Sequence, residues 1–503
     1  MLDIEWTTEE PAAKAGQLLV VPLRDGHDPE AIAQRFGAAV RDAVERSPFK
    51  AKPGDAFSFT RELGGALQHV MLVGTGALTD SSALRQLGHD AAREAQRVGA
   101  GQIVLDLHGA HGLPAEGADA PQAGSLLAQG LELGTYAYDR FLSEPNRRPL
   151  TLASVSVWGR SAAPADGSGR GQIVAAAIAR ARDLGNGPPG LVTPTFLAQT
   201  ATEIADSLRK AGHDVELTIL EREQCEERGM GCYLGVAQGS DQPPKFIHLA
   251  YRPKAAAKGG DAPARVCLVG KGVTFDSGGY SLKPAEGMLD MKLDMCGAAA
   301  VIGAFEGAVR LEVGYELHAI VAAAENLVSG KAYKLGDVLT ASNGKTVEIN
   351  NTDAEGRLTL ADAMVYASKL EPELMIDFAT LTGACIIALG PKIAGVMTRD
   401  EALYSDWSAA AERSGEPMWR LPLPEDLKEQ LKSKVADMRN TGERWGGALT
   451  AGLFLSEFNE GVRWMHLDIA GPAMVSKAYG VTTPGASGVP VATILELLTH
   501  PLS

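Results

Sequence analysis

Cysteine is scarce in this chain of 503 residues, which has only five, an odd number with no Cys-x-x-Cys pair. This pattern disfavours a disulfide framework and is typical of reduced, buried thiols in a cytosolic protein. Positive charge is also in deficit, because 47 Lys and Arg stand against 62 Asp and Glu, for a net charge of −15. Such a balance disfavours sequence-independent binding to nucleic acid.

Long apolar runs are missing as well. The two longest charge-free stretches, 184–202 and 478–495, contain several prolines and are rich in Gly and Thr, so neither predicts a membrane helix. The N-terminus is acidic and lacks the basic segment and apolar run of a secretory signal. The chain has no His-Glu-x-x-His motif, and its Gly-rich loops are not followed by Gly-Lys-Ser/Thr. We therefore expect a cytoplasmic protein without membrane association, and neither a single-zinc helix-borne protease nor a phosphate loop.

The composition is that of a soluble globular protein, with 45% hydrophobic and 22% charged residues. In the first part of the chain, short apolar runs alternate with helix-like segments, which predicts a small α/β unit. The apolar runs are 17–22, 68–73 and 102–107, and the helix-like segments are 29–46 and 84–98.

The second half repeats this alternation on a larger scale. Mostly apolar strands between helices predict a largely parallel sheet covered on both faces. The predicted strands are 265–269, 316–323, 346–349, 374–379 and 464–469, and the predicted helices are 298–309, 358–369 and 450–459. The predicted fold class is therefore α/β, with a small N-terminal α/β domain and a larger C-terminal catalytic domain with a mostly parallel central sheet.

The boundary between the domains is predicted from a change in composition. Segment 161–169 is rich in Ser, Ala, Pro and Gly and resembles a linker, and a helix is predicted over 172–184 before the Gly- and Pro-rich segment 185–190. We predict an N-terminal domain over 1–165, a linker with a helix over 166–190, and a catalytic domain over 191–503.

Charged residues gather in the segments that follow the predicted strands of the second half. In parallel sheets, ligands bind beyond the carboxyl ends of the strands. The residues concerned are four carboxylates (Asp276, Asp294, Asp353 and Glu355) and three cations (Lys271, Lys283 and Arg357). One interpretation is a solvated acidic cluster balanced by Lys and Arg. Four carboxylates sharing one cleft would repel each other, however, and divalent cations such as Mn²⁺, Mg²⁺ or Zn²⁺ would relieve that repulsion. The whole set therefore favours a di-metal hydrolase.

The motifs that carry these residues resemble those of the leucyl aminopeptidase family, also called cytosol aminopeptidase or bacterial aminopeptidase A. The segment NTDAEGRL at 351–358 matches the family's signature octapeptide, and VGKGVTFDSGG at 269–279 precedes it in the family order. Further family-like blocks are 229–231, 235–240, 377–384, 444–447 and 466–471. The resemblance covers most of 180–500, whereas the first 160 residues resemble the family only in layout.

The resemblance implies two divalent metal ions per subunit, Mn²⁺ or Zn²⁺. Asp276 and Glu355 would contact both ions, Asp353 would bind one, and Lys271 and Asp294 would bind the other. Two adjacent cations would lower the pKa of a water that bridges them, which makes a nucleophile available near neutral pH. Lys283 would stabilise the charge that develops on the scissile carbonyl oxygen. Arg357 would hold a bicarbonate ion that shuttles a proton to the leaving amine.

The resemblance also implies the substrates and the assembly. The pocket for the first side chain would be formed by Met291, Thr380, Gly383 and Ala473, which are all uncharged. Peptides with N-terminal Leu, Met or another apolar residue should therefore be preferred over those with Asp or Glu. Relatives assemble as homohexamers of two stacked trimers, and some also bind DNA as regulators. DNA binding is the alternative function here, and a gel shift across a salt series would reveal it.

A few positions depart from the family pattern or invite another interpretation. Cys296 stands where the family usually has Gly, and we read it as a small side chain in a glycine-like pocket. Asn326 begins a segment, 326–330, that lacks a common proline, and segment 472–474 lies where the family varies. His108 and His111 have a ligand-like spacing, but with Asp106 as their only close acid they are better read as loop residues.

Overall fold

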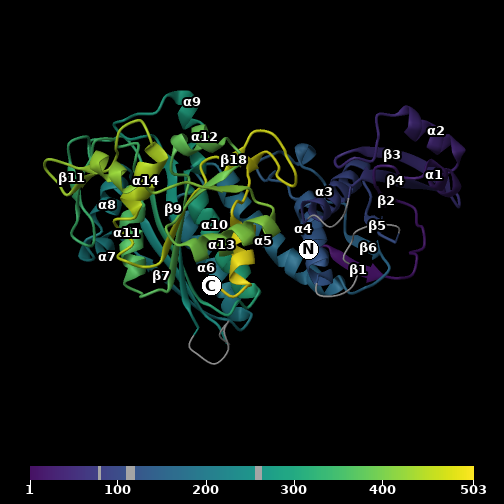
Figure 1. Ribbon diagram of the computed structural model, residues 1–503, viewed down its shortest axis with the longest axis horizontal. Coiled ribbons are helices and arrows are strands. Elements are labelled where there is room, and N and C mark those ends of the chain that lie inside the picture. Colours follow the sequence, from purple (N-terminus) through teal and green to yellow (C-terminus); the bar gives the residue numbers. More distant parts are fainter. Residues whose placement is uncertain (77–80, 109–118, 255–262) are drawn as a thin grey trace. The chain divides into compact units, whose positions relative to one another are not determined.

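The computed structural model describes residues 1–76, 81–108, 119–254 and 263–503 (Figure 1). They form two compact units, each described separately below. Unit 1 comprises Met1–Ala176 with Tyr479–Val481, and unit 2 comprises Ala177–Ala478 with Thr482–Ser503. Among these described residues, none of the helices combines the length and the apolar character needed to cross a membrane.

Unit 1 is built on a six-stranded sheet in the order β1-β6-β5-β2-β4-β3. All neighbouring strands are parallel except the edge pair β3–β4, which is antiparallel. The strands are β1 (Asp3–Thr7), β2 (Gln17–Leu23), β3 (Ala56–Leu63), β4 (Ala66–Gly74), β5 (Gln102–Asp106) and β6 (Ser154–Trp158). Side chains of β2 alternate between the two faces of the sheet and contribute to a hydrophobic cluster on each face. Leu18 and Val20 belong to one cluster, and Leu19 and Val21 belong to the other.

Helices cover both faces of this sheet. The first cluster includes side chains of α3 (Ser81–Val98) and α4 (Ala120–Thr135), and the second includes those of α1 (Pro29–Phe36) and α2 (Ala38–Arg46). A short 3₁₀ helix, η1, spans Glu144–Asn146. The prediction of one helix over 29–46 is wrong, because the chain breaks at Gly37, whose φ of 94° lies in a region that suits glycine.

Unit 2 contains an eight-stranded sheet in the order β15-β14-β17-β13-β9-β10-β8-β7. Its four central strands are mutually parallel, whereas β14 and β8 run antiparallel to the central strands beside them. The strands are β7 (Asp214–Leu220), β8 (Lys245–Arg252), β9 (Arg265–Asp276), β10 (Glu316–Asn326), β13 (Leu374–Ala379), β14 (Ala394–Met397), β15 (Met418–Arg420) and β17 (Trp464–Asp468). The predicted fold class is confirmed: both units are α/β, and the larger one has a mostly parallel central sheet.

Two small sheets accompany the large one in unit 2. One joins β11 (Val338–Thr340), β12 (Thr346–Glu348) and β16 (Met438–Arg439), and the other joins β18 (Met474–Val475) and β19 (Gly485–Ala486). The expectation that 346–349 belongs to the main sheet is therefore wrong. This short strand pairs with β11 and β16 instead, yet it still leads the chain into the predicted motif at 351–358.

The remaining helices belong to unit 2 or lead into it. They are α5 (Ala165–Asn186), α6 (Pro194–Lys210), α7 (Arg222–Glu227), α8 (Gly231–Ala237), α9 (Ala285–Met288), α10 (Cys296–Arg310), α11 (Gly356–Ser368), α12 (Gly383–Leu389), α13 (Glu401–Ser414), α14 (Gly447–Leu455) and α15 (Val491–Leu498), with 3₁₀ helices η2 (Met291–Met295) and η3 (Glu425–Leu431). Helix α5 begins at Ala165, so part of the segment expected to be a linker, 161–169, is helical.

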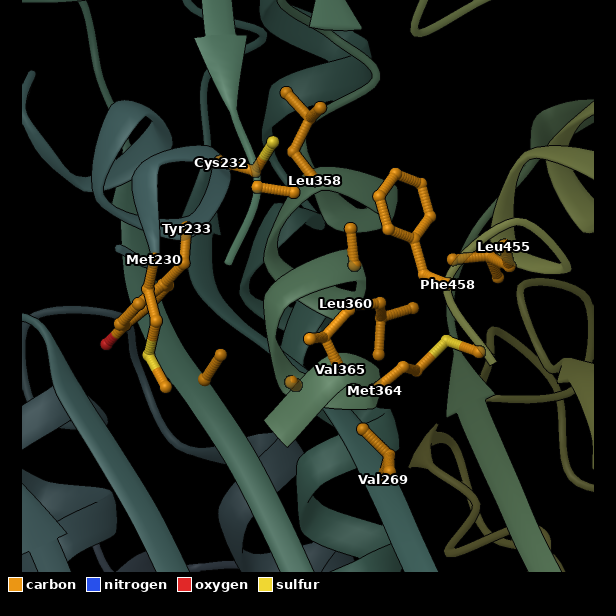
Figure 2. Packing of buried hydrophobic residues seen from close by; sticks show 14 of the residues in the cluster. Met230, Cys232, Tyr233, Val269, Leu358, Leu360, Met364, Val365, Leu455 and Phe458 are labelled. Carbon is orange, nitrogen blue, oxygen red and sulfur yellow. The ribbon is translucent and has the colours of Figure 1, made fainter. Parts of the chain in front are cut away.

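The core of unit 2 on one face of the sheet is organised around α11 (Figure 2). Leu360 and Met364 of this helix lie at the centre of the view, with Val269 of β9 below them and Phe458 to one side. The cluster extends to Tyr233 of α8. Because α11 is buried along almost its whole length, this packing fixes the position of the loop that precedes it.

Candidate active site

A cavity of about 300 Å³ lies at the carboxyl ends of β9 and β13, where the sheet rule places a ligand. It brings together most of the residues singled out from the sequence: Lys271, Asp276, Lys283, Met291, Asp294, Asp353, Glu355, Arg357, Thr380 and Gly383. Ala473 is buried and is not among the lining residues, whereas Ala470 is. Leu293, Leu381 and Ile386, which were not predicted from the sequence, also line the cavity.

Lys271 reaches the cavity from the middle of β9. Its side chain lies on the same face of the sheet as Val269, toward α11, because alternate residues of a strand share a face. Gly356 at the start of α11 leaves space for it, since a Cβ at that position would lie 2.3 Å from Lys271 Cε. The close approach of helix and lysine therefore depends on a glycine at position 356.

The ammonium group of Lys271 is buried among oxygen atoms. Its Nζ lies 2.6 Å from Asp294 Oδ1 and 2.8 Å from Glu355 Oε1. It also donates a hydrogen bond of 3.0 Å to the carbonyl oxygen of Thr380, whose hydroxyl donates to Asp294 Oδ1 at 2.9 Å. Four segments of the chain therefore meet at this lysine: β9, η2, the residue that precedes α11 and the loop after β13.

Lys283 forms the second centre of positive charge. Its Nζ lies 2.8 Å from Asp276 Oδ2 and 2.5 Å from Asp353 Oδ1. The other oxygen of Asp276, Oδ1, accepts hydrogen bonds of 2.8 Å from the backbone N–H of Gly278 and from the side-chain amide of Asn326. Asp276 therefore has one oxygen held by the surrounding structure and one turned toward the charged cluster.

The donor set fits divalent cations. One carboxylate oxygen from each of Asp276, Asp353 and Glu355 lies within 4.8 Å of the others, as ligands to a common ion would. Asp294 Oδ2 and Glu355 Oε2 are buried and accept no hydrogen bond from the described residues. A buried carboxylate oxygen without a partner is costly, and a hard or borderline cation would satisfy it. The residues present therefore fit a metal centre.

Without a cation, the charges of the cluster perturb one another. Burial, together with the negative charge of Glu355, raises the pKa of Asp276 to about 6 even though Lys283 opposes this shift. Burial and the nearby carboxylates also raise the pKa of Asp294. Burial alone would lower the pKa of Lys271, but the charges of Asp294 and Glu355 outweigh it and raise that pKa. The cluster thus has a net excess of negative charge that its lysines only partly balance.

Arg357 lies at the edge of the cavity and is almost fully buried. Its Nη1 donates a hydrogen bond of 2.8 Å to the carbonyl oxygen of Asn440, and its Nε has no partner among the described residues. Burial lowers the pKa of its guanidinium to about 10, against the opposing effect of Glu355. A buried cation with an unused donor is suited to hold an anion.

A layer of buried polar residues supports the loop after β13. Asp468, at the end of β17, accepts hydrogen bonds from the hydroxyl of Thr382 at 2.6 Å and from the backbone N–H of Leu381 at 3.2 Å. Asp377 on β13 accepts from His466 and Trp464 at 2.6 and 2.7 Å. The segments 377–384 and 466–471 are family-like in sequence, but their motifs do not reveal that these residues position the loop.

Two further positions discussed in the sequence, Cys296 and His108, have structural explanations. Cys296 is buried near Gly185, where a Cβ would lie 3.0 Å from its Sγ, and burial raises the pKa of its thiol to about 12. In unit 1, His108 stacks on Trp158 with ring centroids 5.1 Å apart. His111 lies outside the described residues.

Two domain models of one protein family match most of this chain. Residues 179–495 match the model of the cytosol aminopeptidase family, catalytic domain, and residues 9–145 match the N-terminal domain of the same family. A probable cytosol aminopeptidase of Synechococcus sp. (strain CC9605) is 45% identical over 489 residues, 96% of each chain. A probable cytosol aminopeptidase of Gloeothece citriformis (strain PCC 7424) is 41% identical over 503 residues, covering 98% of this chain and 99% of the relative.

Two solved structures share the whole fold. A mutant of tomato leucine aminopeptidase superposes with a TM-score of 0.87 at 36% identity, covering 99% of this chain and 96% of that one. The bottromycin maturation enzyme BotP in complex with Mn gives a TM-score of 0.83 at 34% identity, with 97% and 99% covered. The fold and the relatives are those of an exopeptidase, a hydrolase that removes residues from the N-terminus of peptides. The chain belongs to the cytosol aminopeptidase family.

Proposed function

We propose that this aminopeptidase uses two divalent metal ions, Mn²⁺ or Zn²⁺, to hydrolyse the first peptide bond of peptides with an apolar N-terminal residue. One observation carries the proposal: four carboxylates and two lysines converge on one cavity, where two carboxylate oxygens are buried without a hydrogen-bond partner in the described structure. The manganese bound to the related enzyme BotP supports it.

The metal ligands would be Lys271, Asp276, Asp294, Asp353 and Glu355, the residues whose oxygen and nitrogen atoms face one another in the cavity. Two cations held by these residues would supply Lewis acidity and lower the pKa of a water molecule, which makes it a nucleophile near neutral pH. For Lys271 to act as a ligand, its amine must lose the proton that now pairs with Asp294 and Glu355. A lysine can do this beside a dication, whereas an arginine cannot.

Two further side chains would act on the substrate. Lys283 reaches into the cavity with a charged amine, and we assign it the stabilisation of the negative charge that develops on the scissile carbonyl oxygen. Arg357 would hold a bicarbonate ion through its unused Nε–H. That ion would supply proton transfer to the leaving amine.

The preference for apolar residues rests on the lining of the cavity. Met291, Thr380 and Gly383 are joined there by further uncharged residues, among them Leu293, Leu381, Ile386 and Ala470. Burying a charged first side chain against this lining would be costly. Leu and Met should therefore be hydrolysed faster than Asp or Glu. The family resemblance adds Ala473, which is buried, to this set.

The decisive experiment compares two dipeptide amides with N-terminal leucine, one with a free amine and one with an N-acetylated amine. Each is assayed with Mn²⁺ or Zn²⁺ and again after a chelator has removed the metal. We expect turnover only with the free amine and only with metal. Hydrolysis of the acetylated peptide would show that the amine is not recognised, and full activity of the metal-free protein would remove the ions from the reaction. A kcat/KM for N-terminal Asp equal to that for Leu would overturn the assigned pocket.

The assembly and location are part of the same proposal, and the resemblance to the family supports them. We propose a homohexamer in the cytoplasm. Large apolar side chains exposed on unit 2 support an assembly, since such surface is often covered by another subunit. Among them are Leu289, Ile387 and Trp445, with exposed fractions of 79%, 89% and 73%. Sedimentation of the purified protein as a monomer at micromolar concentration would contradict the hexamer.

A further inference from the structure

Asn326 occupies the last position of β10 and is fully buried. Its side-chain nitrogen donates two hydrogen bonds, one of 2.8 Å to Asp276 Oδ1 and one of 2.9 Å to the carbonyl oxygen of Thr352. Asp276 ends β9, and Thr352 immediately precedes Asp353. A single amide group therefore uses both of its hydrogens to join the two segments that carry the proposed metal ligands.

An irregularity in the sheet creates this contact. Strands β9 and β10 pair in regular register up to Val273 and Ala324, after which the register shifts so that Glu325 lies opposite Phe275 and Asn326 opposite Asp276. Thr274 is the extra residue, and its hydroxyl donates to the carbonyl oxygen of Ala324. Bulges of this kind re-aim side chains next to active sites. Without the shift, Asn326 would lie opposite Phe275 instead of Asp276.

The chemistry of the neighbours fixes the orientation of the amide. Both partners, a carboxylate oxygen and a carbonyl oxygen, are acceptors, so the nitrogen of Asn326 must face them and the oxygen must point away. That oxygen approaches Gly279, where a Cβ would lie 3.0 Å from it. The other orientation would place oxygen against oxygen at two buried contacts.

We propose that Asn326 is a positioning residue for the metal centre, which sets the orientation of Asp276 and its distance from Asp353. This inference rests on the proposed di-metal function. With Gly278 N–H and Asn326 both bound to Oδ1, the second oxygen of Asp276 is the one left for the cluster. Groups that orient metal ligands in this way typically change metal affinity by 10–100-fold when they are removed.

The test measures Mn²⁺ binding by the full-length protein without substrate. Asn326→Ala should weaken Mn²⁺ binding by roughly 10–100-fold in competition with a chelating dye. Thermal unfolding in EDTA gives a separate measure of how much the loss of two buried hydrogen bonds destabilises the metal-free protein. Asn326→Ser, which keeps one donor, should show a smaller loss of Mn²⁺ affinity and provides the measurement if the alanine variant does not fold.

Tyr333→Phe is the matched control. The hydroxyl of Tyr333 donates to the same carbonyl oxygen of Thr352 at 2.8 Å, and no hydrogen bond joins it to Asp276 in the described structure. This variant should lower the unfolding temperature in EDTA, as Asn326→Ala does, but should change Mn²⁺ affinity less than threefold. A role in folding alone would lower stability in both variants and leave Mn²⁺ affinity unchanged in both.

The outcomes separate the inference from the function on which it rests. If the unmodified protein binds neither Mn²⁺ nor Zn²⁺, the proposed di-metal function fails. If the unmodified protein binds Mn²⁺ and the Asn326 variants bind it equally tightly, only the positioning role is overturned. Equal losses in Asn326→Ala and Tyr333→Phe would also overturn it, because the effect would then come from Thr352 rather than from Asp276.

Discussion

The amine of Lys283 contacts Asp276 and Asp353 but is not among the proposed metal ligands. Lys283→Ala should therefore retain two metal ions and lower kcat on the order of 10²–10³-fold, as removal of a preorganised charge beside a developing oxyanion does. Metal analysis and kinetics on the same sample check this expectation. Lys292→Ala is the control, because that lysine on η2 donates to the carbonyl oxygen of Asn186 outside the cavity lining. Loss of metal from Lys283→Ala would make Lys283 part of the metal site instead.

Lys271 allows a different test, because a lysine binds a cation only through its neutral amine. Its unperturbed pKa of about 10.4 makes that form rare at pH 7, but a neighbouring dication can stabilise it. Lys271→Arg should empty the site shared with Asp294, since the guanidinium keeps its charge. The site with Asp353, Asp276 and Glu355 should bind its ion more weakly. Two tightly held ions per chain in this variant would remove Lys271 from the set of ligands.

Much of the site could be predicted from the types and spacing of its residues, but Asn326 could not. Asp353 and Glu355 stand two apart in a motif, so their spacing and the family resemblance predicted them, and both line the cavity. Asn326 could not be selected in this way, because its contact with Asp276 depends on a one-residue shift between two strands 50 positions apart. A sequence pattern shows which residues follow a strand but not how two strands are aligned.

Helices and strands were predicted well where the hydrophobic pattern is regular over the whole element. The parallel core strands β9, β10, β13 and β17 all lie within or around the predicted ranges. Strand β7 was missed although Val215, Leu217 and Ile219 alternate with polar residues, a pattern typical of a half-exposed edge strand. The break at Gly37 was missed because the apolar periodicity continues across it, and only the backbone conformation of the glycine divides the helix.

The first residue of α11, Gly356, should be required for the close packing of this helix against Lys271. Gly356→Ala would place a Cβ 2.3 Å from Lys271 Cε, and Lys271 cannot easily move because Asp294 and Glu355 hold its amine. We expect weaker metal binding and at least a tenfold lower kcat/KM, although alanine favours a helix by about 1 kcal/mol over glycine. Gly169→Ala is the control, since a Cβ there would meet no atom within 4 Å. Unchanged metal affinity in Gly356→Ala would show that Lys271 has more room than the packing indicates.

At the scale of the whole molecule, the order of apolar runs was enough to predict two α/β units. It was not enough to predict the mixed edges of the larger sheet. Strand β8 runs antiparallel to β10, and together they carry a chain of three polar groups. Buried His248 lies 2.9 Å from buried His318, which lies 3.1 Å from partly exposed Glu316. Polar side chains facing each other across two strands become visible only when the pairing is known.

These histidines give the stability of the molecule a pH dependence. Burial and the neighbouring His318 lower the pKa of His248 to about 4, whereas an unfolded chain has a pKa of about 6.5. As the pH falls from 6.5 toward 4, the unfolded state takes up a proton that the folded state does not. The free energy of unfolding should therefore fall, by up to about 3 kcal/mol from this group.

His248→Gln keeps a polar side chain but does not titrate, so its urea-unfolding midpoint should decline less than that of the unmodified protein between pH 7 and 5. Comparing the two slopes cancels the contribution of groups remote from His248, including buried Asp362, whose raised pKa acts in the opposite direction. Burial also lowers the pKa of His318, which contacts His248 and therefore contributes to the slope in the same direction as His248. Identical slopes would show that His248 titrates normally in the folded protein.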